Sequence, residues 1–231
     1  MIRSWKVEFD TLLDRLGVML AGAGFVLRRR GQAYRRKTAI GQDIFHIQRS
    51  LHFDGMNISA DVAIRCDAIE NFLFELYRGI TIPGLGPEIP KGMATLGNGV
   101  GYLGPENRLQ MWPVRSVEDA DNVATLLFDS CVEIAEPNFF AVYNSLESIY
   151  QVLKQESKGD LSVGRLPTAR KAVVAALLLN LSRTEIEDLI RCKASVLSNN
   201  ERQSERFRTF LGLLQQKHPE IVEGISFPID A

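Results

Sequence analysis

The chain has 231 residues, of which 45% are hydrophobic, 24% charged and 8% aromatic, and its net charge is −1 at pH 7. These fractions are close to the averages for soluble globular proteins and exclude a collagen-like, low-complexity or mostly disordered chain. The balanced charge gives no whole-protein reason to expect nucleic acid or an acidic membrane as a partner.

The cysteines and the apolar runs indicate the compartment. Cys66, Cys131 and Cys192 are odd in number and form no C-x-x-C pair, which is typical of reduced thiols. Acidic residues precede the first apolar run, so no signal peptide is expected. The longest apolar run, Val173–Leu179, is far shorter than the ~20 residues of a membrane-spanning helix. We therefore expect a cytoplasmic protein with no membrane segment.

The first part of the chain is predicted to be a helix followed by a β-meander. Apolar residues recur at helical spacing from Trp5 to Leu20. Runs with strand character follow at Phe25–Arg30, Ala33–Ala39, Ile44–Leu51 and Asn57–Arg65. The connections between these runs are short, and short connections force neighbouring strands to be antiparallel. We expect four strands, with the helix packed across one face.

The middle of the chain is predicted to be a loop followed by helices. Asp67 can cap a short helix over Ile69–Tyr77, and a Gly/Pro-rich connection follows from Gly79 to Gly104. After a short edge strand over Leu109–Val114, Ser116 with Asp119 predicts a helix N-terminus. Pro137 suits the first turn of another helix.

Lys158-Gly159-Asp160 interrupts the helical pattern and is the predicted domain boundary. Beyond it the sequence predicts helices only, over Pro167–Leu181, from Ser182 with Glu185 as a capping box, and over Asn200–His218. The expected fold class is α+β, with an antiparallel meander of four to five strands packed against helices in residues 1–157. An all-helical extension in residues 158–231 completes it.

Basic residues are concentrated near the N-terminus. Residues 1–40 contain nine basic and three acidic side chains, whereas residues 41–160 contain eight basic and seventeen acidic ones. Most of the basic excess lies between Arg28 and Lys37. Two interpretations stay open: the basic segment is neutralised within the fold, or it meets an external anionic partner.

Alternation in the predicted strands separates a dry face from a wet face. Apolar residues such as Phe45 and Ile47 alternate with polar ones such as His46 and Gln48. The candidate binding residues on the polar face are Arg28, Arg30, Arg36, His46, Gln48 and Asp61. This face can be merely solvated, can bind a ligand or partner, or can support proton transfer by a His–carboxylate pair.

Three sequence features give only weak support for a nucleotide, metal or nucleic-acid site. The sequence GVGYLG at 99–104 matches G-x-G-x-x-G, but it is followed by Pro105 and a strand-like run, so no nucleotide cofactor is expected. His46, His52 and His218 have no metal-site spacing, and no metal is expected. The basic segment contains a single aromatic residue, Tyr34, which argues against a single-stranded nucleic-acid site.

Short segments of the first strands resemble the DUF4304 family of bacterial proteins. They are GFVLRRRG at 24–31, YRR at 34–36, IFHIQRS at 44–50 and MNISADV at 56–62. The resemblance implies an α+β fold and a bacterial cytoplasmic protein, but it brings no established activity.

The sequence therefore predicts a non-enzymatic binding protein that meets an acidic protein partner through the polar sheet face, as an immunity protein meets a toxin. Paired charges would speed and orient such docking. One alternative is a hydrolase or transferase that uses His46 and Asp61 under the Gly79–Gly104 loop as a lid. Another is nucleic-acid binding through the Arg28–Lys37 hairpin. The sequence does not indicate the oligomeric state.

Overall fold

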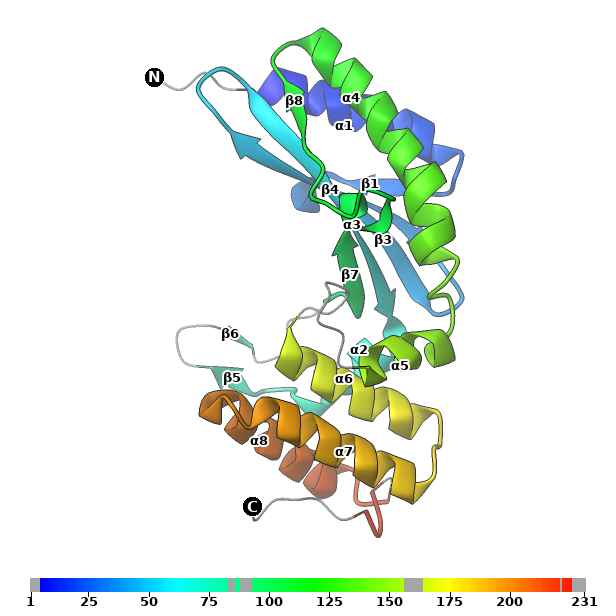
Figure 1. The fold of residues 1–231 in the computed structure, drawn as a ribbon, viewed down its shortest axis with the longest axis vertical. Helices are drawn as coiled ribbons and strands as arrows, with labels where there is room; N and C mark the ends of the chain where they lie inside the picture. The colour runs from blue at the N-terminus through cyan, green and yellow to red at the C-terminus, as the bar shows by residue number, and fades with distance from the viewer. Residues whose placement is uncertain (1–4, 83–85, 88–92, 156–163, 221, 226–231) are drawn as a thin grey trace. The chain divides into compact units, whose positions relative to one another are not determined.

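The computed structural model describes residues 5–82, 86–87, 93–155, 164–220 and 222–225, and it has the predicted α+β fold (Figure 1). Contacts group the chain into a first unit of residues 1–64 and 97–144 and a second unit of residues 65–96 and 145–231. These limits differ from the predicted division into 1–157 and 158–231, whose boundary at 158–160 lies outside the described residues.

An antiparallel sheet forms the framework of the first unit. Its strands are β1 (Val26–Arg28), β2 (Ala33–Lys37), β3 (Gly41–Leu51), β4 (Met56–Cys66), β7 (Leu96–Gly99) and β8 (Trp112–Val114). Their order is β1-β2-β3-β4-β7, and β8 also pairs with β4. The first four strands follow one another in sequence and in space, which confirms the predicted meander.

Two helices cover one face of this sheet. The helices α1 (Lys6–Ala21) and α4 (Val117–Asp129) pack side by side (Figure 1). In β4, buried residues alternate with partly exposed ones from Met56 to Ile64, as a sheet with one covered face requires. The hydroxyl of Tyr34 donates a hydrogen bond to the Leu13 carbonyl oxygen at 2.5 Å, which ties β2 to α1.

The helix that starts at α4 continues further than expected. Ser116 accepts a hydrogen bond from the Asp119 amide, which confirms the predicted cap. The new helix predicted at Pro137 is wrong, because α4 continues directly into a π-helix, η2 (Ser130–Phe140), that contains this proline. The Ala141 amide donates to the Glu136 carbonyl oxygen at 2.9 Å, five residues back, as π-helical geometry requires.

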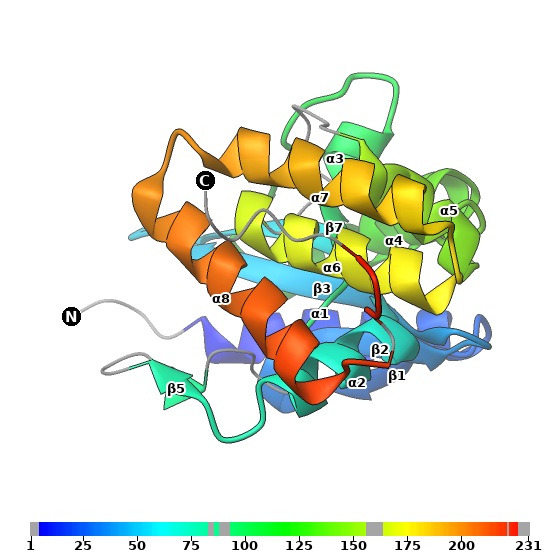
Figure 2. The same cartoon turned by 90° about the horizontal axis from the view of Figure 1, so that it is seen from below.

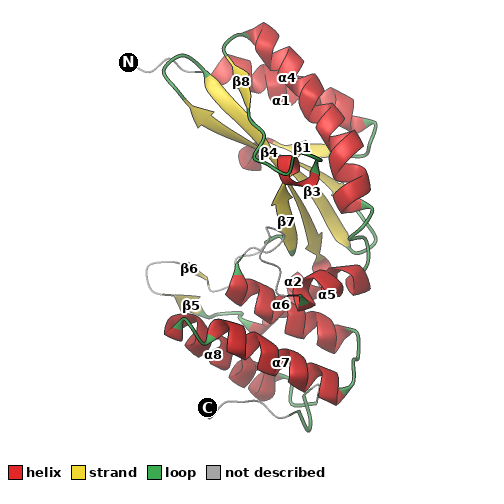
Figure 3. Ribbon diagram, in the orientation of Figure 1, coloured by secondary structure: helices red, strands yellow, loops and turns green. Residues whose placement is uncertain are grey.

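The second unit is mostly helical (Figure 3). It contains α2 (Asp67–Leu76), β5 (Thr81–Ile82), β6 (Gly86–Pro87), α5 (Leu146–Lys154), α6 (Arg165–Leu178), α7 (Arg183–Leu197) and α8 (Glu201–Lys217). The helices α6, α7 and α8 pack against one another (Figure 2). The capping box of Ser182 and Glu185 is confirmed at the start of α7. Asp67 does not cap α2; it is the first helical residue, and Cys66 is the N-cap.

Candidate functional site

The register of β1, β2 and β3 decides which side chains share a face. Arg28 pairs with Ala33, and Ala33 pairs with His46. Residues directly opposite on neighbouring strands point to the same side of a sheet. Arg28 and His46 therefore lie on one face, which we call the outer face. Tyr34 and Phe45 lie on the other face, the inner face, which α1 covers.

Two further cations belong to the outer face. Arg35 pairs with Val26 and Ile44, and Lys37 pairs with Gln42, so both share the face of Arg28. Neither Arg35 nor Lys37 was among the predicted site residues. A signal for them existed in the sequence, because an inward Tyr34 places residues 35 and 37 outward.

These side chains surround a groove of about 830 Å³, which we call the cationic groove. Its lining consists of Gly24, Val26, Arg28, Arg30, Gly31, Arg35, Arg36, Lys37 and Gln42. Five of these residues are cationic, and none of the described lining residues is a carboxylate. A concave surface with one sign of charge raises the local concentration of ions of the opposite sign.

Most of the cations in the groove have no carboxylate partner. Within the described ranges, Arg28, Arg30, Arg35 and Lys37 lie within 4.0 Å of no carboxylate oxygen. Arg35 Nη1 instead donates to Gln42 Oε1 at 3.0 Å. Arg29 differs, since it forms ion pairs with Asp10 and Asp14 of α1. The predicted self-neutralisation of the basic segment therefore applies to only part of it.

Arg36 lies on the inner face, apart from the other predicted site residues. It pairs with Asp43 across the strands, and its guanidinium carbon lies 4.7 Å from the centre of the Phe25 ring. Arg36 donates to Asp43 at 2.7 Å and to Glu136 at 2.9 Å. Burial opposes its charged form, but these two carboxylates outweigh burial and raise the pKa of Arg36. It nevertheless reaches the lining of the cationic groove.

The structure brings the three remaining predicted residues together on the outer face. His46 Nδ1 lies 3.8 Å from Asp61 Oδ2, and Gln48 Nε2 donates to the same oxygen. The His46 and Asp61 side chains are 39% and 37% exposed, so solvent and ligands reach them. A histidine beside a carboxylate can accept or donate a proton.

Only part of the predicted Gly79–Gly104 lid can be placed. Residues 83–85 and 88–92 lie outside the described residues. The short helix α3 (Val100–Leu103) follows β7, and a Cβ on Gly99 would lie 3.7 Å from Asp61 Oδ1 and 3.1 Å from Tyr102 Cδ2. The distance to Tyr102 is tighter than an ordinary contact and the distance to Asp61 is not, so the glycine makes room for the Tyr102 ring. Tyr102 is 37% exposed and was missed by the sequence analysis.

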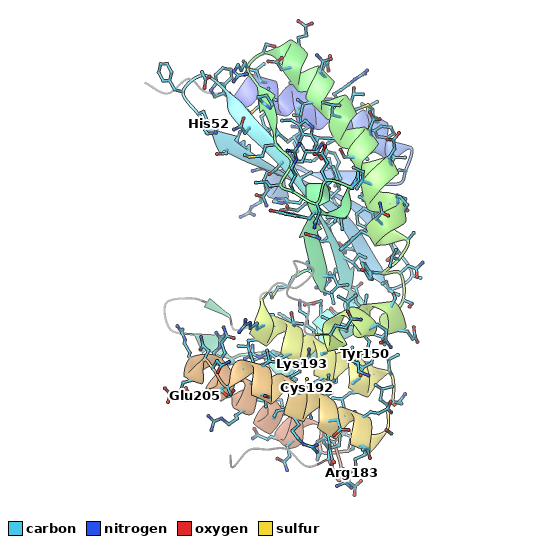
Figure 4. All side chains as sticks on the ribbon, in the orientation of Figure 1. His52, Tyr150, Arg183, Cys192, Lys193 and Glu205 are labelled. Atoms are coloured by element: carbon cyan, nitrogen blue, oxygen red, sulfur yellow. The ribbon has the colours of Figure 1, made fainter. Side chains whose placement is uncertain are left out.

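Other histidines have local partners. His52, at the turn after β3 (Figure 4), has its Nε2 at 3.1 Å from Asn57 Nδ2, while nearby Asp54 pairs with Arg115. His218 packs against the Phe72 ring at 4.9 Å between centroids. Among the described residues, no group of three or more His, Cys, Asp and Glu side chains is placed to hold a metal ion. None of the described helices is both long and apolar enough to cross a membrane.

The second unit contains a buried ion pair between Lys171 and Glu70. Lys171 Nζ lies 3.0 Å from Glu70 Oε1, and these side chains are 2% and 1% exposed. Thr95 donates to the same carboxylate at 2.8 Å, and Lys171 also donates to the Ala94 carbonyl oxygen. Burial lowers the pKa of Lys171, although the negative charge of Glu70 opposes this shift. We interpret this cluster as structural because solvent does not reach it.

No family model, curated protein or solved structure matches the chain, so the comparisons transfer no function to it. The resemblance to the DUF4304 family therefore stays a prediction.

Proposed function

We propose that this chain is a binding protein that docks an acidic surface of a protein partner in the cationic groove. The observation that carries the proposal is the set of four cations in one groove, Arg28, Arg30, Arg35 and Lys37, none of them paired with a described carboxylate. Unpaired guanidinium groups present fork-shaped donors that suit carboxylates. A partner with several carboxylates would match the shape and the sign of this surface.

Nucleic acid is the weaker alternative occupant. Single-stranded sites combine basic grooves with exposed aromatic rings on which bases stack. No described residue lining the groove is aromatic, and Tyr34 of the same segment is fully buried with its hydroxyl bonded to Leu13.

A second candidate function rests on the contact between His46 and Asp61. At 3.8 Å a small side-chain adjustment brings them within hydrogen-bond distance, as acid–base catalysis of a hydrolase or transferase would need. The cations on the same face of the sheet would favour an anionic substrate. Turnover of a panel of nitrophenyl esters and phosphates by wild type, lost in His46→Gln and Asp61→Asn, would favour this function over docking alone.

The groove can be tested by charge reversal in the full-length chain. We expect Arg28→Glu,Arg35→Glu to weaken binding of a labelled oligo-glutamate peptide at least about tenfold at low salt, because two attractive charges become repulsive. The matched control is Arg202→Glu,Arg208→Glu, which changes the net charge equally on exposed positions of α8.

Fluorescence anisotropy at two salt concentrations measures both variants. Equal affinity of the groove variant and the control would overturn the proposal, because net charge alone would then explain the binding. A labelled single-stranded oligonucleotide provides the competing arm. Nucleic acid is the correct occupant if the oligonucleotide binds more tightly than the peptide and if the groove variant no longer binds the oligonucleotide.

A further inference from the structure

Arg36 connects the inner face with the cationic groove. The register pairs Val26 with Arg35, so residues beyond Arg35 in β2 extend past the start of β1. Gly24 lies at this end with a φ of 81°, and a Cβ built on it would lie 3.6 Å from Arg36 Cδ. Gly24 thus lies beside the aliphatic part of the Arg36 side chain, and both residues line the groove.

Two carboxylates share the guanidinium of Arg36, and they differ in exposure. Asp43 accepts from Nε at 3.0 Å and from Nη2 at 2.7 Å, and its side chain is 6% exposed. Glu136 accepts only from Nη2, at 3.0 and 2.9 Å, and its side chain is 41% exposed. Asp43 is thus the buried partner, whose Oδ2 accepts from both Nε and Nη2, whereas Glu136 is a solvent-accessible second partner of Nη2.

We infer that Glu136 occupies a carboxylate-binding subsite at the end of the cationic groove, and that a carboxylate of the acidic partner replaces it on Arg36. This inference rests on the proposed function and names one subsite within it. Because Glu136 itself places a carboxylate on Arg36 Nη2, we expect the subsite to accept a carboxylate of the partner at the same nitrogen.

Loss of the contact with Arg36 costs little free energy at Glu136 and more at Asp43. The Glu136 side chain is 41% exposed, so its carboxylate regains water when it leaves Arg36, and ion pairs near the surface contribute little to stability. Asp43 would instead lose its partner in a buried site, where burial already raises its pKa against the opposing effect of Arg36. Arg36 therefore keeps Asp43 when Glu136 leaves.

Charge requires an exchange instead of an addition. With both carboxylates bound, the cluster of Arg36, Asp43 and Glu136 carries one net negative charge, which repels a further carboxylate. A partner carboxylate that replaces Glu136 leaves the net charge of the cluster unchanged. The backbone of Glu136 is fixed by the π-helical bond from Ala141, so a rotation of its side chain suffices.

The test is Glu136→Gln in the full chain, with oligo-glutamate peptide as the probe. Removing the internal competitor should tighten peptide binding about two- to fivefold, which corresponds to the usual strength of an exposed ion pair. Glu133→Gln is the matched control, because it removes the same charge from an exposed position of η2. The control should tighten binding less than Glu136→Gln.

A second measurement follows the exchange directly. In wild type, the side-chain carboxyl ¹³C resonance of Glu136 should shift on peptide addition, while that of Asp43 should not. If Glu136→Gln binds no more tightly than Glu133→Gln, although Arg28→Glu,Arg35→Glu has lost binding, the subsite is wrong and the docking groove stands. If the groove variant keeps its binding, both proposals fail together.

Discussion

Two charged clusters, one in each unit, differ in exposure and in pairing. On the outer face of the first unit, Arg28 and Arg35 lie beside other cations with no carboxylate partner among the described residues. In the second unit, Lys171 and Glu70 are almost completely buried and lie 3.0 Å apart. A charge removed from water must be paired, whereas a solvated charge can stay without a partner. The unpaired charges are therefore the ones that a ligand can reach.

The largest expected effect on stability comes from breaking the buried pair of Lys171 and Glu70. Lys171→Met should lower the free energy of unfolding by about 3–5 kcal/mol, because it leaves the Glu70 carboxylate buried without its cation. Chemical denaturation measures this loss. The double variant Glu70→Gln,Lys171→Met removes both charges and keeps an acceptor for Thr95, so most of the stability should return. An equally unstable double variant would mean that packing, and not charge, dominates at this position.

A smaller effect concerns an exposed charge of the second unit. The Ser182 hydroxyl and amide donate hydrogen bonds to Glu185, and they hold the pKa of this carboxyl below its usual value. A carboxylate with a lowered folded-state pKa stabilises the fold above its ordinary pKa of 4.5, and this contribution is lost as the pH falls through the folded value.

Ser182→Ala should cost about 1 kcal/mol at neutral pH, the usual value of an N-cap, and should flatten the stability profile on the acidic side. Thermal unfolding from neutral pH to below the pKa of Glu185 measures both. The conservative Ser182→Thr keeps the hydroxyl and should retain the wild-type profile. An unchanged profile in Ser182→Ala would show that Glu185 does not depend on this cap.

The smallest expected effect on stability belongs to the cationic groove. Arg28→Glu,Arg35→Glu should change the free energy of unfolding by no more than about 0.5 kcal/mol, because neither side chain has an ion pair to lose. The same variant is expected to lose peptide binding, so function and stability separate at these positions. A large loss of stability would place these arginines with Lys171 as structural charges and would remove the contrast between the units.

Parts of both units follow from local patterns in the sequence. Alternation and short turns predicted the meander, and the caps at Ser116 and Ser182 were predicted from residue type and spacing. Arg36 shows what such patterns miss. It was placed on the polar face by composition, but a cation can point inward when a buried carboxylate and aromatic rings receive it. That partner, Asp43, depends on the register of β2 and β3.

The π-helix shows a second limit. Pro137 cannot donate a backbone hydrogen bond, so it is usually read as the start of a helix. The chain instead widens its turn and continues through the proline. Apolar spacing does not distinguish this solution from a break, because the choice depends on the tertiary contacts that hold η2. Glu136, which η2 places at Arg36, was therefore not foreseen as a partner of a groove-lining residue.

The chain passes between the two units three times, after residues 64, 96 and 144. During synthesis, the first unit can complete its contacts only when residue 144 has left the ribosome. The segment 65–96 must then wait for residues 145–231 before its partners in the second unit exist. A nascent chain therefore exposes the apolar side of α2, with Ile69, Leu73 and Leu76, for longer than that of any other helix of the second unit.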